Sequence, residues 1–290
     1  MGILSRTQID HFWRKGYVVA EDGATPVQLA AMKAQVTAWV EQSRTHAANW
    51  GETIDGRARF DLEDGHGAET PRLRRVANPQ EVSAVFLDAI RNLPLVDMAA
   101  DLIGPDVKFH HAKLNLKQPG METRAGYHQD HPYDPHTNDD VVVTLLMLDD
   151  MTPENGCLRV LPGSHRGEHY SHWRGDRFTG EIAPEIAAGF EPRMVPVTGR
   201  AGSVCLMHTW TVHGSPGNAS DAPRTLFICD YTAADALPLM RPAMPNAQLG
   251  EVVRGAASHG VRLKEGLIEL PAAYMESSFF ELQGQKSAAE

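Results

Sequence analysis

Cysteine is scarce in this sequence, and the few cysteines do not form a pair. Cys157, Cys205 and Cys229 are far apart, and each lies in an apolar run with the character of a strand. A disulfide framework needs an even set of cysteines, and a structural zinc site needs closely spaced ligands. We therefore expect three buried, reduced thiols, which are typical of a cytoplasmic protein.

Long apolar runs and an excess of basic residues are missing as well. No window approaches the roughly 18 apolar residues of a membrane-spanning helix, and residues 1–7 lack the basic and apolar pattern of an export signal. The formal net charge is -10, whereas nucleic acids and anionic membranes are bound through basic surface. These absences exclude membrane insertion and nucleic-acid binding as the main function. We expect a small-molecule partner, and a monomer or homodimer.

Hydrophobic spacing predicts that the first third of the chain is mainly helical. Apolar side chains recur at intervals of three and four residues over 5–16, from 25 to about 40, and on both sides of Pro94 between 79 and 104. Proline cannot continue a helix interior, so the last stretch should form two helices. Residues 44–80 lack this periodicity and are rich in Gly, Arg, Asp and Glu, which indicates a long loop or lid.

From Val107 onward the hydrophobic period changes to two, which predicts strands. These strands are expected at 107–117, around 127–131, and at 141–148, 157–161, 194–197, 203–213 and 225–232. Short strands with Gly and Pro turns, preceded by helices, predict a mostly β fold with flanking helices, namely a double-stranded β-helix or cupin-like jelly roll. We expect a single domain, with a mainly helical part and lid loop over 1–106, a jelly-roll core over 107–232 and a C-terminal extension over 233–290.

His128 and Asp130 form a His-x-Asp motif within residues 127–132. Alternate side chains of a strand point to the same side, so one strand can present both an imidazole and a carboxylate. A further histidine would complete the two-histidine, one-carboxylate arrangement of non-haem ferrous oxygenases, which leaves coordination positions open for oxygen and a co-substrate. We predict that His213 is this third ligand.

His208 is the alternative third ligand. It precedes His213 by an odd number of residues in the predicted strand 203–213, so the two should point to opposite faces. The adjoining turn favours His213. Across that turn Arg224 opens the next strand, and antiparallel pairing would bring it to the same face as His213. An arginine suits a carboxylate ligand, because its planar guanidinium binds it through two charge-assisted hydrogen bonds.

Arg72, Arg74 and Arg75 form a basic cluster in the predicted loop 44–80. One interpretation is an ordinary solvated loop, since surface arginines are common. The other is that the cluster lies over the mouth of the site and binds an acidic part of the substrate. The sequence leaves open whether this loop or the C-terminal extension forms a lid.

Several motifs occur in order along the predicted strands: residues 127–130, residues 151–165, residues 202–204, and His213–Ser215 continuing to Arg224. Together they resemble the phytanoyl-CoA dioxygenase family, including its ectoine hydroxylase-like bacterial members. The likeness is strong over roughly 107–232 and fainter in the N-terminal helices. It implies a jelly-roll oxygenase that requires Fe(II), consumes 2-oxoglutarate and O2, and releases succinate and CO2.

The resemblance also implies roles for the matching positions. It implies that the metal ligands are His128, Asp130 and His213. It implies that Arg224, assisted by Ser215, binds the far carboxylate of 2-oxoglutarate. It also implies that the strands carrying Lys113, Asn115 and Thr144 line the co-substrate pocket. Related halogenases lack the carboxylate that Asp130 supplies. The resemblance therefore implies hydroxylation or desaturation of a small metabolite or natural-product intermediate.

Two other classes of protein compete with this interpretation. A cupin-like binding protein without turnover would have a broken triad or no anchor, and a zinc hydrolase would have no use for Arg224. The substrate itself is not identified by the sequence. The residues that flank the metal motifs are candidates for the substrate pocket, with roles in packing as the alternative: Gln129, Tyr133, Asp134, His136 and Trp210. Arg72 is a further candidate.

Overall fold

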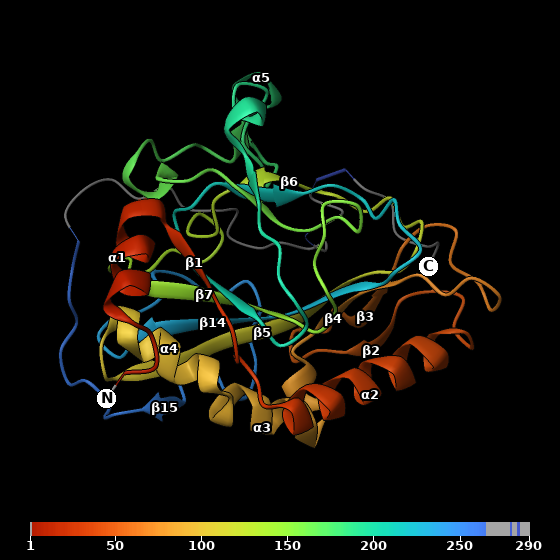
Figure 1. Ribbon diagram of the computed structural model, residues 1–290, viewed down its shortest axis with the longest axis horizontal. Coiled ribbons are helices and arrows are strands. Elements are labelled where there is room, and N and C mark those ends of the chain that lie inside the picture. Colours follow the sequence, from red (N-terminus) through yellow and green to blue (C-terminus); the bar gives the residue numbers. More distant parts are fainter. Residues whose placement is uncertain (1, 265–278, 280–282, 285–290) are drawn as a thin grey trace.

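Two facing antiparallel sheets with helices packed outside them make up the protein (Figure 1). The computed structural model describes residues 2–264, 279, 283 and 284. The larger sheet has the strand order β1 (Tyr17–Ala20), β12 (Val204–His208), β7 (Val141–Met147), β14 (Arg224–Ala233), β5 (Val107–Lys117), β4 (Leu73–Ala77), β3 (Ala58–Leu62) and β2 (Trp50–Glu52), with β15 (Val252–Arg254) also paired to β5. The smaller sheet has the order β11 (Val195–Pro196), β8 (Arg159–Val160), β13 (His213–Ser215) and β6 (Ala125–His128).

Helices α2 (Pro26–Ser43), α3 (Ala84–Asn92) and α4 (Pro94–Ile103) cover the outer face of the larger sheet, opposite the side on which β6 lies (Figure 1). Helix α1 (Arg6–Lys15) lies beside β1 and β12. A hairpin of β9 (Trp173–Arg174) and β10 (Arg177–Phe178), the short helix α5 (Pro184–Ala187) and the 3-10 turns η1 (Pro79–Glu81), η2 (Ser164–Arg166) and η3 (Glu191–Arg193) complete the described elements.

The predicted helices are confirmed, together with the signals that start and stop them. Ser5 caps α1 in a reciprocal pair with Gln8, and Gly16 ends it with a φ of 84° that favours glycine. Thr25 and Gln28 cap α2 in the same way. The break at Pro94 separates α3 from α4, because proline occupies the first position of α4, where no amide hydrogen is needed.

Strand alternation divides the apolar side chains of the larger sheet between two cores. On β7, Val142 and Leu146 pack toward the helices. Val143 and Leu145 face the smaller sheet, where they contact a separate apolar cluster. This explains the almost unbroken apolar run at 141–148, since a strand covered on both faces needs apolar side chains on both. The jelly-roll prediction agrees with this arrangement.

The predicted loop or lid at 44–80 is wrong in part, because β2, β3 and β4 extend the larger sheet through it. Their periodicity is hidden by charged side chains that are buried as ion pairs. Arg74 lies 3.0 Å from Asp61, and Arg59 lies 2.8 Å from Glu81, with each arginine side chain at most 5% exposed. A pattern based on apolar residues cannot detect strands whose buried positions carry paired charges.

The predicted single strand 203–213 is also wrong. The chain leaves the larger sheet after His208 at the end of β12 and enters the smaller sheet at His213 in β13. Consequently β13 pairs with β6 and β8, whereas β14 pairs with β5 and β7. Arg224 therefore does not lie on a strand paired with that of His213, and the two side chains belong to facing sheets.

The cysteines and helices agree with the expectations drawn from composition. Cys157, Cys205 and Cys229 are buried and free. Among the described residues, none of the helices combines the length and the apolar character needed to cross a membrane.

The buried pair of Arg74 and Asp61 gives a test of the β3–β4 extension. Replacing Arg74 with Ala should lower the free energy of unfolding by about 3–5 kcal/mol, because it leaves a buried carboxylate without its partner. Arg6→Ala breaks the ion pair between Arg6 and Asp10, whose side chains are 84% and 53% exposed. This substitution should change the free energy of unfolding little. Urea unfolding of both variants measures the difference, and equal midpoints would contradict this account of the strands.

Candidate active site

Two histidines and one aspartate meet where β6 and β13 pair. His128 ends β6, His213 begins β13, and the two are direct partners in the antiparallel register. Asp130 lies just beyond the end of β6, where its backbone amide donates to the carbonyl of Thr209. Its carboxylate oxygens lie 3.5 Å from Nε2 of His128 and 3.6 Å from Nε2 of His213. The structure thus brings together the three predicted ligands.

Backbone carbonyls fix the orientation of both imidazoles. Nδ1 of His128 lies 2.7 Å from the carbonyl oxygen of Gly126, and Nδ1 of His213 lies 3.0 Å from that of Thr211. Each Nδ1 therefore carries the hydrogen and donates it, so each Nε2 keeps a free lone pair toward Asp130. Burial lowers the pKa of His213 to about 4, which keeps this imidazole neutral and able to ligate.

Asp130 completes a set of donors that fits a divalent transition metal. Burial alone would raise the pKa of its carboxyl, but His213 and His128 hold that pKa well below the ordinary value. Its Oδ2 atom is inaccessible to solvent and has no hydrogen-bond partner. An anionic oxygen left without a partner beside two imidazole lone pairs is what a bound cation would satisfy.

His208, the alternative ligand, lies elsewhere. Its ring packs against Trp13 and His165, and its Nδ1 accepts the backbone amide of Trp210 at 3.1 Å. The predicted exclusion of His208 agrees with this placement, but the reason differs from strand parity. The chain changes sheets between the two histidines.

A cavity between the sheets connects this triad with Arg224. The inner face of β14 carries Arg224, Leu226, Ile228 and then Asp230, and the first three line the cavity. Arg224 is 2% exposed and its Nε has no hydrogen-bond partner. Burial lowers its pKa to about 10, so it is protonated at neutral pH. A buried cation of this kind needs an anion.

Lys117 and Ser215 lie beside Arg224, and the sequence interpretation missed the lysine. Lys117 is the direct partner of Arg224 in the β5–β14 register. Its ammonium donates to Oγ of Ser215 at 2.8 Å and to the carbonyl of Pro216. This contact joins the two sheets at the Arg224 end of the cavity. Lys113 and Asn115 were assigned to the pocket by the family resemblance. Strand alternation along β5 puts Lys117 on the same face as both, and that signal could have identified it.

Of the three residues predicted to lie at the co-substrate pocket, Lys113 and Asn115 line the cavity and Thr144 does not. Thr144 points to the helix side of β7, between Val143 and Leu145, which line the cavity. Its hydroxyl donates to the carbonyl of Cys229 at 3.0 Å. The assignment of Thr144 to the co-substrate pocket is therefore corrected, because alternation puts it on the wrong face of the strand.

A second chamber meets the first beside Asp130. Arg75, Lys113 and Phe279 line both chambers, and Tyr133, Asp134 and Asp230 line only the second. The hydroxyl of Tyr133 donates to the carbonyl of Gly180. Of the predicted pocket residues that flank the metal motif, Tyr133 and Asp134 therefore lie where a molecule next to the metal centre would be.

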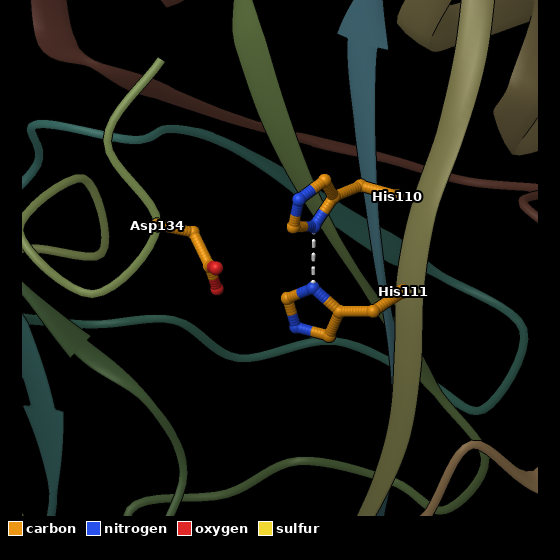
Figure 2. A group of neighbouring side chains, drawn as sticks. All are labelled: His110, His111 and Asp134. Atoms are coloured by element: carbon orange, nitrogen blue, oxygen red, sulfur yellow. Dashed lines mark hydrogen bonds between the residues drawn. The ribbon is translucent and has the colours of Figure 1, made fainter. Parts of the chain in front are cut away.

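A bulge in β5 brings two adjacent histidines to the back of this chamber. The β5–β14 register shifts between the pair Asp230 and His111 and the pair Tyr231 and Phe109, so His110 has no partner. Adjacent residues normally point to opposite faces, and a bulge lets both point to one. Figure 2 shows His110 and His111 facing each other, with the carboxylate of Asp134 directed toward them. Their Nδ1 atoms lie 2.8 Å apart.

These three side chains are close enough to hold a metal ion, but their hydrogen bonding gives another interpretation. At 2.8 Å, one Nδ1 must donate a hydrogen bond and the other must accept it. The two Nδ1 atoms are therefore engaged with each other. Burial lowers the pKa of His110 to about 4 and raises that of Asp134 to about 6. His111 lines the chamber, and His110 contacts it through Nδ1.

The remaining predicted substrate residues have structural contacts instead. Gln129 is fully buried and bonds the backbone of Trp210 and Tyr170 at 2.8 and 2.9 Å. Trp210 stacks between His131 and His169. None of these lines the chambers at the triad. The same is true of His136, which bonds the carbonyl of Asp134 at 2.7 Å, and of Arg72, which pairs with Glu63 at 3.0 Å.

Arg75 is the member of the basic cluster that faces the site. Arg75 lines both chambers at the triad, whereas Arg72 and Arg74 line neither. Contact of the cluster with substrate stays a prediction. Strand β4 points Arg74 and Arg75 to opposite faces, and Arg75 is the direct partner of Asn115 on β5. The sequence could not distinguish Arg74 from Arg75, because residues 44–80 were predicted to be a loop, and a loop has no alternating faces.

Comparison with known proteins gives consistent matches. The sequence profile of the phytanoyl-CoA dioxygenase family matches residues 12–226. A probable alpha-ketoglutarate-dependent hypophosphite dioxygenase from Stutzerimonas stutzeri is 32% identical over 232 residues, 78% of each chain. An ectoine dioxygenase from Nocardia farcinica is 26% identical over 269 residues, 86% of each chain. The structure of iron-bound EctD from S. alaskensis has a TM-score of 0.67 at 23% identity, covering 91% of this chain and 89% of that one. This structural likeness confirms the double-stranded β-helix.

The buried histidines predict that acid destabilises the fold. Burial lowers the pKa of His110 and His136 to about 4, whereas an unfolded histidine titrates near 6.5. Between these values the unfolded chain binds protons that the folded chain does not, so the free energy of unfolding should fall as pH falls. Asp134 and Asp230, whose pKa values burial raises, oppose this trend. Further buried histidines with lowered pKa values outnumber them, namely His131, His172 and His208.

Urea unfolding between pH 7 and pH 5 tests this expectation. The free energy of unfolding should drop by on the order of 2 kcal/mol for each such histidine between pH 6.5 and 5. His136→Gln should make the pH dependence shallower, whereas His259→Gln, at an exposed residue, should leave it unchanged. A midpoint that does not move between pH 7 and pH 5 would contradict the prediction.

Proposed function

Because the chain belongs to the phytanoyl-CoA dioxygenase family and is a 2-oxoglutarate-dependent non-haem iron dioxygenase, we propose that it oxidises a small metabolite at the centre formed by His128, Asp130 and His213. The observation that carries this proposal is that one cavity contains two charged side chains, each with a buried atom that lacks a hydrogen-bond partner. Oδ2 of Asp130 and Nε of Arg224 are both buried without a hydrogen-bond partner. The first calls for a cation and the second for an anion.

The three ligands would hold Fe(II) through Nε2 of each histidine and the carboxylate of Asp130. When bound, the iron supplies the activation of O2 that is coupled to the conversion of 2-oxoglutarate to succinate and CO2. The carbonyls of Gly126 and Thr211 fix the two rings, so the ligands are oriented before the metal arrives. A triad with a single carboxylate leaves coordination positions open on one side. The presence of Asp130 supports hydroxylation or desaturation of the substrate.

At the other end of the cavity, Arg224 would bind the far carboxylate of 2-oxoglutarate. The cavity is also lined by apolar side chains that include Leu158 and Leu226, and low polarity strengthens a charge-assisted pair. The hydroxyl of Ser215 would donate to the same carboxylate, because Lys117 already donates to its oxygen. Lys113 and Asn115 line the wall between this end and the metal centre.

The relatives support a small-molecule substrate. Hypophosphite and ectoine, named for the dioxygenases that share 32% and 26% identity with this chain, are both small. The chamber beside Asp130 lies on the side of the triad away from Arg224, where a substrate would face the metal. Phe279 lies at the junction of the two chambers, and its ring is 5.1 Å from that of His128, where it would limit the access of water.

Asp130→Ala tests the metal centre. The variant should lose the stoichiometric binding of Fe(II), the absorption band of the anaerobic Fe(II)–2-oxoglutarate complex, and any release of succinate. Asp10→Ala, on the exposed face of α1 with a side chain 53% exposed, should retain all three. Full iron content and activity in Asp130→Ala would contradict the proposal.

Arg224→Gln tests the anchor separately. Loss of charge-assisted hydrogen bonds worth about 1.5–3 kcal/mol should raise the Kd for 2-oxoglutarate by roughly 10- to 150-fold. The iron content should stay unchanged, because Arg224 contacts none of the ligands. Arg159→Gln provides the control, since Arg159 pairs with Glu191 and does not line the cavity. An unaltered Kd in Arg224→Gln would contradict this role.

A further inference from the structure

We propose that the substrate of this enzyme carries a small oxyanionic group, a carboxylate or a phosphorus oxyanion, which is bound beside the metal centre by Arg75 and Lys113. This inference rests on the proposed function, because it names the class of molecule that the second chamber receives. It assigns that task to strands β4 and β5, and not to residues of the His-x-Asp motif.

Arg75 is a buried cation with an unmet need for an anion. Its side chain lies on the inner face of the larger sheet opposite Asn115, and the residue is 7% exposed. Its Nε has no hydrogen-bond partner, and its Nη2 donates to the sulfur of Met244 at 3.1 Å. Within the described part of the chain, no carboxylate lies within ion-pair distance of it. An unpaired buried guanidinium is unfavourable, so an anionic ligand would stabilise it.

Lys113 provides a second positive charge at the same place. It lies one step along the inner face of β5 from Asn115, and both lysine and arginine line the junction of the two chambers. Its ammonium is 5.9 Å from the ring centroid of Phe279. It forms no ion pair within the described residues. Arg75 and Lys113 therefore approach the space beside Asp130 from adjacent strands.

The position of this pair distinguishes it from the 2-oxoglutarate anchor. The inner row of β14 runs from Arg224 at one end to Asp230 at the other, a length of roughly 20 Å at the usual rise of a strand. Arg224 lines only the first chamber, whereas Arg75 also lines the second, together with Asp230 and His111. A second anion-binding pair on the substrate side is not needed for a co-substrate that Arg224 already anchors.

The acidic side chains of the chamber do not neutralise this pair. Burial raises the pKa of Asp230 well above its ordinary value. Asp134 accepts the backbone amide of Ala243 at 2.8 Å and is directed toward His110 and His111 (Figure 2). The nearby Arg57 is already paired, 2.6 Å from Asp55. Asp134 and Asp230 line the chamber, but among the described residues neither forms an ion pair with Arg75 or Lys113.

The geometry of a guanidinium selects the chemistry of the ligand. Its planar fork donates two parallel hydrogen bonds to a carboxylate or to two oxygens of a phosphorus oxyanion. A neutral amide of the same size offers one acceptor and no charge. The proposal therefore predicts discrimination by charge, with both oxyanion classes able to bind and their relative affinities set by size.

Binding of simple anions to the anaerobic Fe(II)–2-oxoglutarate enzyme tests the proposal. The probes are hypophosphite, phosphite and propionate, with propionamide as the neutral counterpart, and the readouts are calorimetric Kd and the shift of the absorption band. The wild type should bind at least one anion, and should bind propionate at least tenfold more tightly than propionamide if carboxylates are the preferred class. Preference for hypophosphite or phosphite would identify the phosphorus class.

Arg75→Gln should weaken binding of the preferred anion at least tenfold while the Kd for 2-oxoglutarate stays within about twofold. Lys113→Gln should also weaken the anion at least tenfold, but because Lys113 lines the co-substrate cavity as well, only Arg75→Gln is used to compare the two constants. Arg72→Gln is the matched control, because Arg72 belongs to the same basic cluster but lies outside both chambers, and it should change neither constant. Retention of the absorption band in every variant shows that the metal and co-substrate site is intact, which separates this test from that of the proposed function.

Three results would overturn the proposal. The first is a wild type that binds none of the anions or binds only the neutral amide. The second is anion binding that Arg75→Gln leaves within twofold. The third is an Arg75→Gln variant that weakens 2-oxoglutarate as much as the anion, which would place Arg75 in the co-substrate site.

Discussion

The antiparallel register between β6 and β13 is the constraint on which the site depends. It sets His128 directly opposite His213, and the carbonyl two residues before each histidine then turns its Nε2 inward. Asp130 can join them only because the chain bends just past β6 and ties its amide to Thr209 in the segment that crosses between the sheets. The ligand set is thus produced by main-chain hydrogen bonds, which any metal-free form would retain.

Much of the site could be predicted because it depends on local chemistry. The spacing of His128 and Asp130, the capped helices and the proline break at Pro94 are all encoded within a few residues. The pairing of strands is not local. Arg224 was expected to lie beside His213 through a hairpin, whereas it reaches the same cavity from the facing sheet, since the strands that bear the two residues belong to different sheets.

The errors in the predicted pocket have a physical cause. A shift of one residue along a strand moves a side chain to the opposite face of the sheet. Thr144 was placed in the pocket by the strand that carries it, yet its neighbours Val143 and Leu145 are the ones that face inward. The bulge of β5 interrupts its alternation at His110, which has no partner in the register, whereas His111 shares the inward face of Lys113. Strands β3 and β4 were missed altogether, because their buried charges cancel the apolar signal that usually reveals a sheet.

The inner row of β14 has a consequence for how this scaffold can diversify. Its two ends lie in separate chambers, with Arg224 and Lys117 at one and Asp230 with the bulged histidines at the other. Substitutions at the second end would change the lining of the second chamber and leave Arg224 and Lys117 in place. One strand thus contributes side chains both to the chamber proposed for 2-oxoglutarate and to the chamber proposed for the substrate.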